Sequence, residues 1–155
     1  MNISAYLATS GRDDEYIDVI DQLSVFVTDN LEAEEALIIG LDTNESEKST
    51  RRRREAMSKF CNMFSLQSIT PEHMNTFHHN NHTSSSRIDH ILYFIPQAKN
   101  INIEFLENLC KLNNASNLSS HDVIMGKISF QVMRAHASEI DYKHTYTSFE
   151  VCKPQ

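Results

Sequence analysis

The sequence Ala-Leu-Ile-Ile-Gly-Leu at residues 36–41 is the feature that most constrains the fold. It is an uninterrupted apolar run, rich in branched side chains, with acidic residues before it and Asp-Thr-Asn after it. A strand with one face in water alternates apolar and polar residues, whereas this run is apolar on both faces. It therefore predicts a central strand covered on both sides, as in layered α/β proteins. Asp42 and Asn44 would lie where this strand passes into a loop, a common place for functional groups.

Helical and extended segments alternate along the rest of the chain. Residues 1–7 predict a short strand, and residues 13–30 predict a helix whose apolar residues recur at spacings of three and four. A second amphipathic helix follows the arginines at 51–54, and residues 87–94 predict another strand. This order indicates an α/β or mixed α+β fold. Beyond residue 133 the chain is polar without a clear period, so 134–155 is expected to be a tail or linker.

The charge balance limits how the protein meets nucleic acid. The 155 residues include 14 basic and 21 acidic side chains, which give a formal net charge of −7. Proteins that bind nucleic acid by bulk attraction are usually basic, so passive coating of DNA or RNA is disfavoured. A negative charge is compatible with an enzyme that gathers carboxylates around a divalent metal to attack phosphate.

Cysteine usage and hydropathy bear on the compartment. Cys61, Cys110 and Cys152 are far apart and odd in number, unlike a disulfide framework or a zinc site. Reduced thiols in an intracellular protein are the simplest interpretation, which does not distinguish nucleus from cytoplasm. No apolar run approaches 18 residues, so no membrane span is expected.

Three polar clusters follow or lie within strand-like segments: Asp42-x-Asn44, Arg87-Ile88-Asp89-His90 and Ser119-Ser120-His121-Asp122. Taken singly, each is most often a turn or a helix cap. Asp89 is less ordinary, because a carboxylate buried in a strand is costly unless it has a partner. His121 is a suitable partner, and an Asp–His pair orients the imidazole for phosphate contact or proton transfer. Asp42 would then position or deprotonate an attacking water, with Asn44 donating a hydrogen bond to the phosphate.

Four segments together resemble the endonuclease/exonuclease/phosphatase superfamily, which has the DNase I-like fold. ALIIGLDTNES matches the family's strand ending in G-D-x-N, and SSSRIDHILYF matches its S-x-I-D-x-I strand. SSHDVIMGKISF matches the S-D-H motif and the strand after it, and ISAYLATSGRDDEYIDVIDQLS resembles the N-x-Y-x-P strand and the following helix. The resemblance is greatest to the apurinic-type endonuclease domain of non-LTR retrotransposons. It covers about residues 3–132, so residues 1–133 are expected to form the C-terminal half of a four-layer sandwich.

The resemblance implies catalytic roles for five residues. Asp42 would be the carboxylate that activates water, and Asn44 would orient the phosphate with it. Asp89 would pair with His121, which contacts or protonates the scissile phosphate. Tyr6 would be the family's active-site tyrosine near the phosphate.

The resemblance also implies a substrate and a cofactor. Ser119, Arg87 and His78 are expected to contact the substrate. The implied reaction is Mg²⁺-dependent hydrolysis of a DNA phosphodiester, which leaves a nick. The ligands of the metal are left unassigned.

Departures from the family pattern lower the expected activity. Ser120 stands where the family has Asp, Ser4 where it has Asn, and Ala8 where it has Pro. The family's N-terminal half, which supplies an Asn and the Glu that holds Mg²⁺, has no counterpart in the sequence. We therefore expect the chain alone to be weakly active or inactive. Half of a two-sheet sandwich would also leave an apolar sheet face uncovered, which predicts association through that face.

Two other functions are open on the sequence alone. The absent Glu and the change at Ser120 are compatible with a catalytically silent α/β module that binds a protein or nucleic acid. A phosphatase of the same superfamily, acting on phosphorylated lipids or sugars, is the third hypothesis. The sequence Arg-Ile-Asp-His-Ile at residues 87–91 fits the endonuclease branch better.

A group of histidines and a run of arginines suggest binding sites, but each also has a simpler structural interpretation. Four histidines, His73, His78, His79 and His82, indicate a solvated loop or a loop that touches DNA more readily than a zinc site, since no cysteine is near. The arginines at 51–54 point in all directions around a helix. That arrangement favours a solvated helix start over a nucleic-acid or targeting patch.

Overall fold

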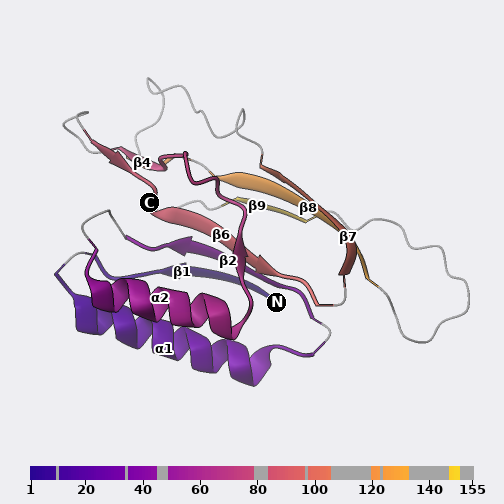
Figure 1. Cartoon of the computed structure of the whole chain (residues 1–155), viewed down its shortest axis with the longest axis horizontal. Coiled ribbons are helices and arrows are strands. Elements are labelled where there is room, and N and C mark those ends of the chain that lie inside the picture. Colours follow the sequence, from indigo (N-terminus) through magenta and orange to yellow (C-terminus); the bar gives the residue numbers. More distant parts are fainter. Residues whose placement is uncertain are drawn as a thin grey trace, which may run out of the picture.

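The structure is a computed structural model that describes residues 1–9, 11–33, 35–44, 49–78, 84–96, 98–105, 120–122, 124–132 and 147–150. The described residues form two helices and nine strands (Figure 1). In chain order these are β1 (Asn2–Tyr6), α1 (Asp13–Asn30), β2 (Leu37–Asp42), α2 (Arg51–Met63), β3 (Gln67–Ser68), β4 (Phe77–His78), β5 (Ser85–Ser86), β6 (Asp89–Phe94), β7 (Ala98–Phe105), β8 (Met125–Val132) and β9 (Thr147–Glu150). The predicted mixed α/β class is confirmed.

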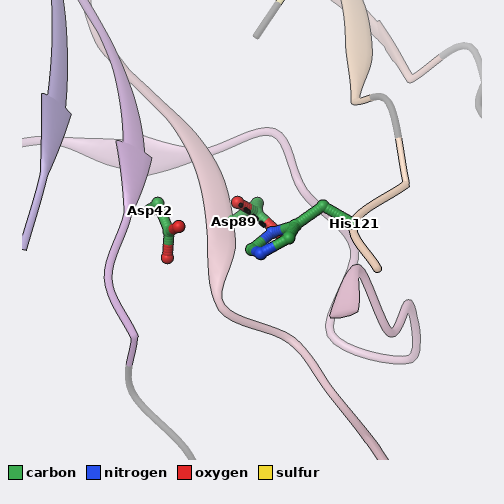
Figure 2. A group of neighbouring side chains, drawn as sticks. All are labelled: Asp42, Asp89 and His121. Carbon is green, nitrogen blue, oxygen red and sulfur yellow. Dashed lines mark hydrogen bonds and ion pairs between the residues drawn. The ribbon is translucent and has the colours of Figure 1, made fainter. Parts of the chain in front are cut away.

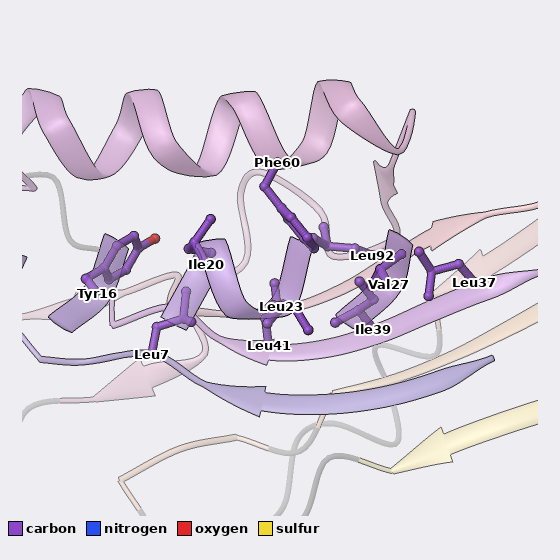
Figure 3. Close-up of a cluster of buried hydrophobic side chains, with 10 residues drawn as sticks. All are labelled: Leu7, Tyr16, Ile20, Leu23, Val27, Leu37, Ile39, Leu41, Phe60 and Leu92. Carbon is purple, nitrogen blue, oxygen red and sulfur yellow. The ribbon is translucent and has the colours of Figure 1, made fainter. Parts of the chain in front are cut away.

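Strand β2 lies inside a four-stranded sheet with the order β1-β2-β6-β3. It runs parallel to β1 and antiparallel to β6, and all its residues except Gly40 are buried. The prediction of a central strand covered on both faces is therefore confirmed. Helices α1 and α2 cover one face of the sheet, with Phe60 of α2 packed against α1 and the strands (Figure 3). The buried residues of this cluster are Leu7, Tyr16, Ile20, Leu23, Val27, Leu37, Ile39, Leu41, Phe60 and Leu92.

A second sheet, with the order β7-β8-β9, covers the opposite face of β2 and β6 (Figure 1). The buried residues between the two sheets are Ile38, Ile69, Ile91, Tyr93, Ile95, Ile124 and Ile128. The described residues thus supply three layers of the expected four: helices, sheet and sheet. Strand β9 pairs with β8, so four residues of the segment expected to be a tail belong to this sheet. The domain boundary at residue 133 stays a prediction, as does association through an uncovered face.

The two helices match their sequence signals. Helix α1 has the predicted bounds and carries three acidic residues in its first turn, where the helix dipole favours them. Helix α2 begins after Thr50, whose side-chain oxygen accepts a hydrogen bond from the backbone N–H of Arg53. Neither helix is long and apolar enough to cross a lipid bilayer.

Arg53 departs from the expected solvated helix start, because its side chain is almost fully buried. Its Nε donates to Asp13 Oδ1 at 2.7 Å, and its two terminal nitrogens donate to the carbonyl oxygens of Ala8 and Thr9. The guanidinium also lies over the ring of Tyr16, 4.5 Å from its centre. Arg53 of α2 therefore binds the segment that connects β1 to α1.

Candidate active site

The ends of three neighbouring strands bring predicted site residues into one row. Tyr6 of β1 is the register partner of Asp42 of β2, which is the register partner of Asp89 of β6. Residues opposite each other on paired strands project from the same face of a sheet. The row therefore lies on the face opposite the helices, beyond the cluster between the two sheets. Asp42 and Asp89 are buried, whereas Tyr6, at the outer end, is 53% exposed.

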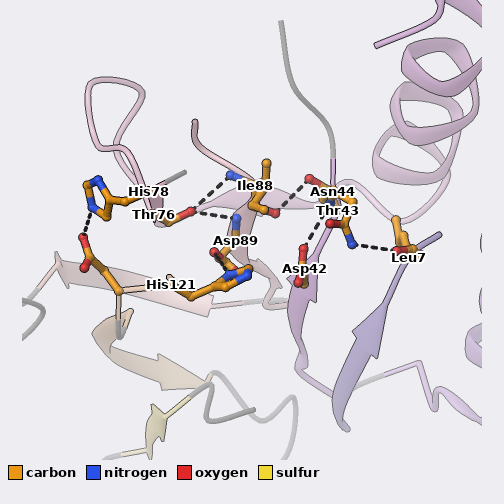
Figure 4. Close-up of polar contacts among 10 residues, drawn as sticks. Leu7, Asp42, Thr43, Asn44, Thr76, His78, Ile88, Asp89 and His121 are labelled. Carbon is orange, nitrogen blue, oxygen red and sulfur yellow. Dashed lines mark hydrogen bonds and ion pairs between the residues drawn. The ribbon is translucent and has the colours of Figure 1, made fainter. Parts of the chain in front are cut away.

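A network of hydrogen bonds fixes the chain around Asp42 (Figure 4). The carbonyl oxygen of Asp42 accepts from the N–H of Leu7, and its Oδ1 accepts from the N–H of Asn44 at 3.1 Å. Asn44 has a φ of 47°, which asparagine tolerates better than most residues. Its Nδ2 donates to the carbonyl oxygen of Leu7 at 2.8 Å, and the buried Thr43 donates twice to the carbonyl oxygen of Ile88. The structure thus gives the Asn44 amide a contact that ties β2 to β1.

Asp89 and His121 form the pair expected from the sequence (Figure 2). His121 Nδ1 lies 3.0 Å from Asp89 Oδ2 and 3.3 Å from Oδ1. An ionised carboxylate only accepts, so Nδ1 carries the proton and Nε2 is the remaining ring nitrogen. Burial raises the pKa of Asp89, as does the neighbouring charge of Asp42, while hydrogen bonds with His121 and Thr76 oppose the rise.

Strand β4 places His121 beside Asp89. Phe77 and His121 form an isolated antiparallel bridge, flanked by hydrogen bonds from His78 N to Ser120 O and from Asp122 N to Thr76 O. The two rings meet edge to face, with their centres 4.8 Å apart. Sequence periodicity gives no signal for such a bridge, because each side contributes only two or three residues.

Three of the converging groups could hold a cation. Asp42, Asp89 and His121 each offer one ligand atom, and these atoms lie within 4.8 Å of one another. Two carboxylates fit Mg²⁺, which prefers oxygen ligands, and the neighbouring negative charges provide a reason to bind it. His121 fits better as a hydrogen-bond donor, since Asp89 holds its Nδ1 and Mg²⁺ prefers oxygen. Asp42 and Asp89 are thus the metal-ligating candidates among the described residues.

The other predicted site residues are placed as follows. Arg87 directs its NH1 to the carbonyl oxygen of Thr70 at 3.1 Å. His78 Nε2 contacts Asp122 Oδ2 at 2.9 Å, so it lies beside the segment that carries His121. Ser119 lies outside the described residues. None of these placements tests the substrate-binding roles, which stay predictions.

His90 lies beside Asp89 in sequence but opposite Leu41 in register, on the helix side of the sheet. Burial lowers the pKa of His90 to about 4, with a smaller contribution from the charge of Arg87. It is therefore neutral at physiological pH. Of His90 and His121, it is His121 that reaches the carboxylate row.

Thr76 is a site-supporting residue that sequence analysis missed. It is fully buried, and its Oγ1 accepts hydrogen bonds from the N–H groups of Ile88 (3.1 Å) and Asp89 (3.0 Å). These bonds hold the start of β6 and hence the Asp89 backbone. A lone threonine between short extended pieces carries no local signal for this role.

Thr76→Val is expected to lower the free energy of unfolding by about 2–3 kcal/mol, because it leaves two buried N–H groups without an acceptor. Thr76→Ser keeps the hydroxyl and is the matched control, with an expected loss of about 1 kcal/mol from the missing methyl group. Urea unfolding of both variants measures the difference. Equal losses in the two variants would contradict the assigned role of Oγ1.

Comparison with known proteins finds similarity among solved structures alone. No protein-family model and no curated protein matches the chain. Among solved structures, the chain is similar to the endonuclease domain of TRAS1, a telomere-specific non-LTR retrotransposon, with 15% sequence identity and a TM-score of 0.45. The match covers 84% of this chain and 56% of that one, so the chain spans little more than half the length of its neighbour.

Proposed function

We propose that Asp42, Asp89 and His121 belong to the hydrolytic site of a Mg²⁺-dependent DNA endonuclease of nicking or apurinic type. The convergence of these three residues, within 4.8 Å of one another, carries the proposal. They come from three of the four segments that resemble the endonuclease/exonuclease/phosphatase superfamily. The chain represents part of such a domain and on its own cleaves DNA weakly or not at all. DNA as substrate and an intracellular location belong to the same proposal.

The role proposed for each site residue follows from the geometry. Asp42, buried at the end of β2, orients an attacking water and accepts its proton. Asp89 accepts a hydrogen bond from Nδ1–H of His121 and orients the ring, and in the imidazolium form Nε2 carries a second proton and donates it to a phosphate oxygen as negative charge develops there. Mg²⁺, when bound by Asp42 and Asp89, would neutralise charge on the phosphate. Asn44 supports Asp42 through its backbone N–H, and Tyr6 borders the site at the exposed end of the row.

A silent binding module is the second candidate, and the residue at position 120 favours it. The superfamily pattern has a carboxylate there, whereas this chain has Ser120, whose carbonyl oxygen accepts from His78 N. Among the described residues, the group around His121 contains two carboxylates, those of Asp42 and Asp89. Mg²⁺ usually keeps several waters and binds through one or two carboxylates, so the missing carboxylate at position 120, rather than the number that remains, is what favours the silent module.

A nicking assay on supercoiled DNA with Mg²⁺ tests the proposal. The isolated chain is expected to nick little, and a chain joined to the N-terminal half of a complete family member is expected to nick in an EDTA-sensitive way. Asp42→Asn or His121→Gln in the joined chain should lower the rate by about 10²-fold or more. Asp29→Asn, which alters an exposed carboxylate on α1, is the matched control and should leave the rate unchanged.

The joined chain also separates the two candidate functions. Nicking that depends on Asp42 and His121 supports the endonuclease. A folded joined chain that binds DNA without cutting it contradicts the proposal and supports the binding module. Rapid EDTA-sensitive nicking by the isolated chain would contradict the expected low activity.

A further inference from the structure

We propose that His78 and Asp122 are positioning residues that keep His121 in register opposite Asp89. The inference rests on the proposed function, since it concerns how the histidine of that site is held. His78 and Asp122 form a second His–Asp pair, with Nε2 and Oδ2 2.9 Å apart. The pair joins β4 to the segment that contains His121, which comes 43 residues after His78 in the chain.

The backbone bridge explains why two neighbouring residues act on opposite sides. Phe77 and His121 are the opposed residues of the bridge, flanked by the two hydrogen bonds His78 N to Ser120 O (2.7 Å) and Asp122 N to Thr76 O (2.8 Å). In such a non-hydrogen-bonded antiparallel pair the opposed side chains lie close together on one face. Successive side chains alternate between faces, so the next residues, His78 and Asp122, share the other face.

Both faces of the bridge are thereby occupied. On one face the His121 ring contacts Phe77 and directs Nδ1 to Asp89. On the other face the carboxylate of Asp122, whose side chain is 17% exposed, contacts His78. Asp122 comes one residue after the histidine and points away from the carboxylate row, as its place on an extended chain predicts. Here it contributes to the site through the backbone rather than by facing Asp89.

The His78–Asp122 contact stabilises the register of the bridge between Phe77 and His121. A bridge of one residue pair with two hydrogen bonds specifies its register weakly, and a slip by one residue exchanges the faces of all its side chains. Such a slip would turn His121 away from Asp89. It would present Ser120, with no imidazole, or Asp122, with a third negative charge beside Asp42 and Asp89. The His78–Asp122 contact forms in the observed register and is lost in the slipped ones.

Nitrogen-15 NMR of the labelled full chain tests the proposal through the Nδ1 proton of His121. Asp89 shields this proton from solvent, so its exchange with water reports how the imidazole is held. Asp122→Ala is expected to speed the exchange about threefold, the scale of an exposed ion pair. His78→Ala should have the same effect, and the double variant should add nothing further. Asp122→Asn keeps an oxygen acceptor for Nε2 and should restore most of the protection.

Two controls separate positioning from general stability. Asp14→Ala removes an exposed ion pair of the same length, 2.9 Å to Arg52, on the helices, and should leave the His121 proton unchanged. Exchange of the buried β2 amides should be unchanged by Asp122→Ala, whereas a merely structural role would speed it as well.

The outcomes are distinct for the two proposals. If Asp122→Ala changes the His121 exchange no more than Asp14→Ala does, the positioning role is wrong, while the site itself stands. If Asp89→Ala also leaves that exchange unchanged, the Asp89–His121 pair is wrong and both proposals fall. If Asp122→Ala loosens His121 and the joined chain still does not nick DNA, the positioning role is supported and the endonuclease function is overturned.

Discussion

Replacing Arg53 by methionine is expected to lower the free energy of unfolding by about 2 kcal/mol, because it removes a buried guanidinium that several groups depend on. Asp13 loses the donor to its Oδ1, and the carbonyl oxygens of Ala8 and Thr9 lose theirs. The ring of Tyr16 also loses the cation above its face. The estimate is below the loss usual for a fully buried ion pair, because Asp13 and Thr9 reach solvent.

The neighbouring arginines provide the control for this prediction. Arg52→Met, in the same helix as Arg53, removes an exposed ion pair to Asp14 of α1 and should change the free energy of unfolding by less than about 0.5 kcal/mol. Arg53→Lys keeps the positive charge but loses the planar guanidinium group and its fixed set of donors. The free energy of unfolding should therefore fall by an intermediate amount. Urea unfolding of the three variants measures the order. A loss for Arg53→Met no larger than that for Arg52→Met would show that the guanidinium adds no stability.

The effect of Arg53→Met should also depend on pH. A hydrogen bond from Thr50, followed by one from Arg53, lowers the pKa of Asp13 below its ordinary value of 3.8. A carboxyl group whose pKa is lower in the folded state stabilises the fold above its unfolded pKa, and this contribution is lost as the pH falls through the lowered value. The difference between wild type and Arg53→Met should therefore shrink as the pH falls below about 3.8. Unfolding measured at neutral and acidic pH checks this sign.

Arg53 also shows where sequence reasoning stops. The four arginines at 51–54 are indistinguishable by local pattern, so all four were expected in solvent. The one that is buried is selected by Asp13, which lies 40 residues earlier in the chain. By contrast, the apolar run at 36–41 and the stripe of α1 are local patterns, and the elements they predict are confirmed.

In the candidate site, too, local features could be predicted from the sequence and long-range contacts could not. A carboxylate after a buried strand and another within a strand are visible in the sequence, and the need for a partner pointed to His121. The means by which His121 reaches Asp89 was not predictable, because it depends on a bridge to β4 that is set by long-range pairing. The register that puts Asp42 opposite Asp89 is likewise a property of the assembled sheet.

Replacing Asp89 by asparagine is expected to abolish divalent-cation binding by the chain and nicking by the joined chain, while leaving the free energy of unfolding at neutral pH unchanged or raised by about 1 kcal/mol. The side chain is 6% exposed, and burial raises its pKa, as does the charge of Asp42. Asparagine removes this unfavourable charge yet retains an oxygen that accepts from His121 Nδ1. The substitution should therefore separate the chemistry of the carboxylate from its part in packing.

The pH dependence fixes the sign of this prediction. A carboxyl group whose folded pKa is raised stabilises the fold fully below its unfolded pKa, and the contribution is lost as the pH rises through the raised value. The stability gained by Asp89→Asn should thus be small near pH 3.8 and grow towards neutral pH. Thermal unfolding at both pH values, with and without millimolar Mg²⁺, measures it. Wild type should gain stability from the ion and Asp89→Asn should not, since a ligand stabilises the state that binds it.

Asp14→Asn, at an exposed carboxylate of α1, is the control and should respond to Mg²⁺ as wild type does. A large loss of stability in Asp89→Asn at neutral pH would make Asp89 a structural partner of His121 and nothing more. An undiminished response to Mg²⁺ would remove Asp89 from the metal-ligating candidates. The expected outcome is that Asp89 lowers the stability of the fold and that its replacement ends ion binding. Selection for folding alone would favour replacing such a residue, so Asp89 would then be retained for its function.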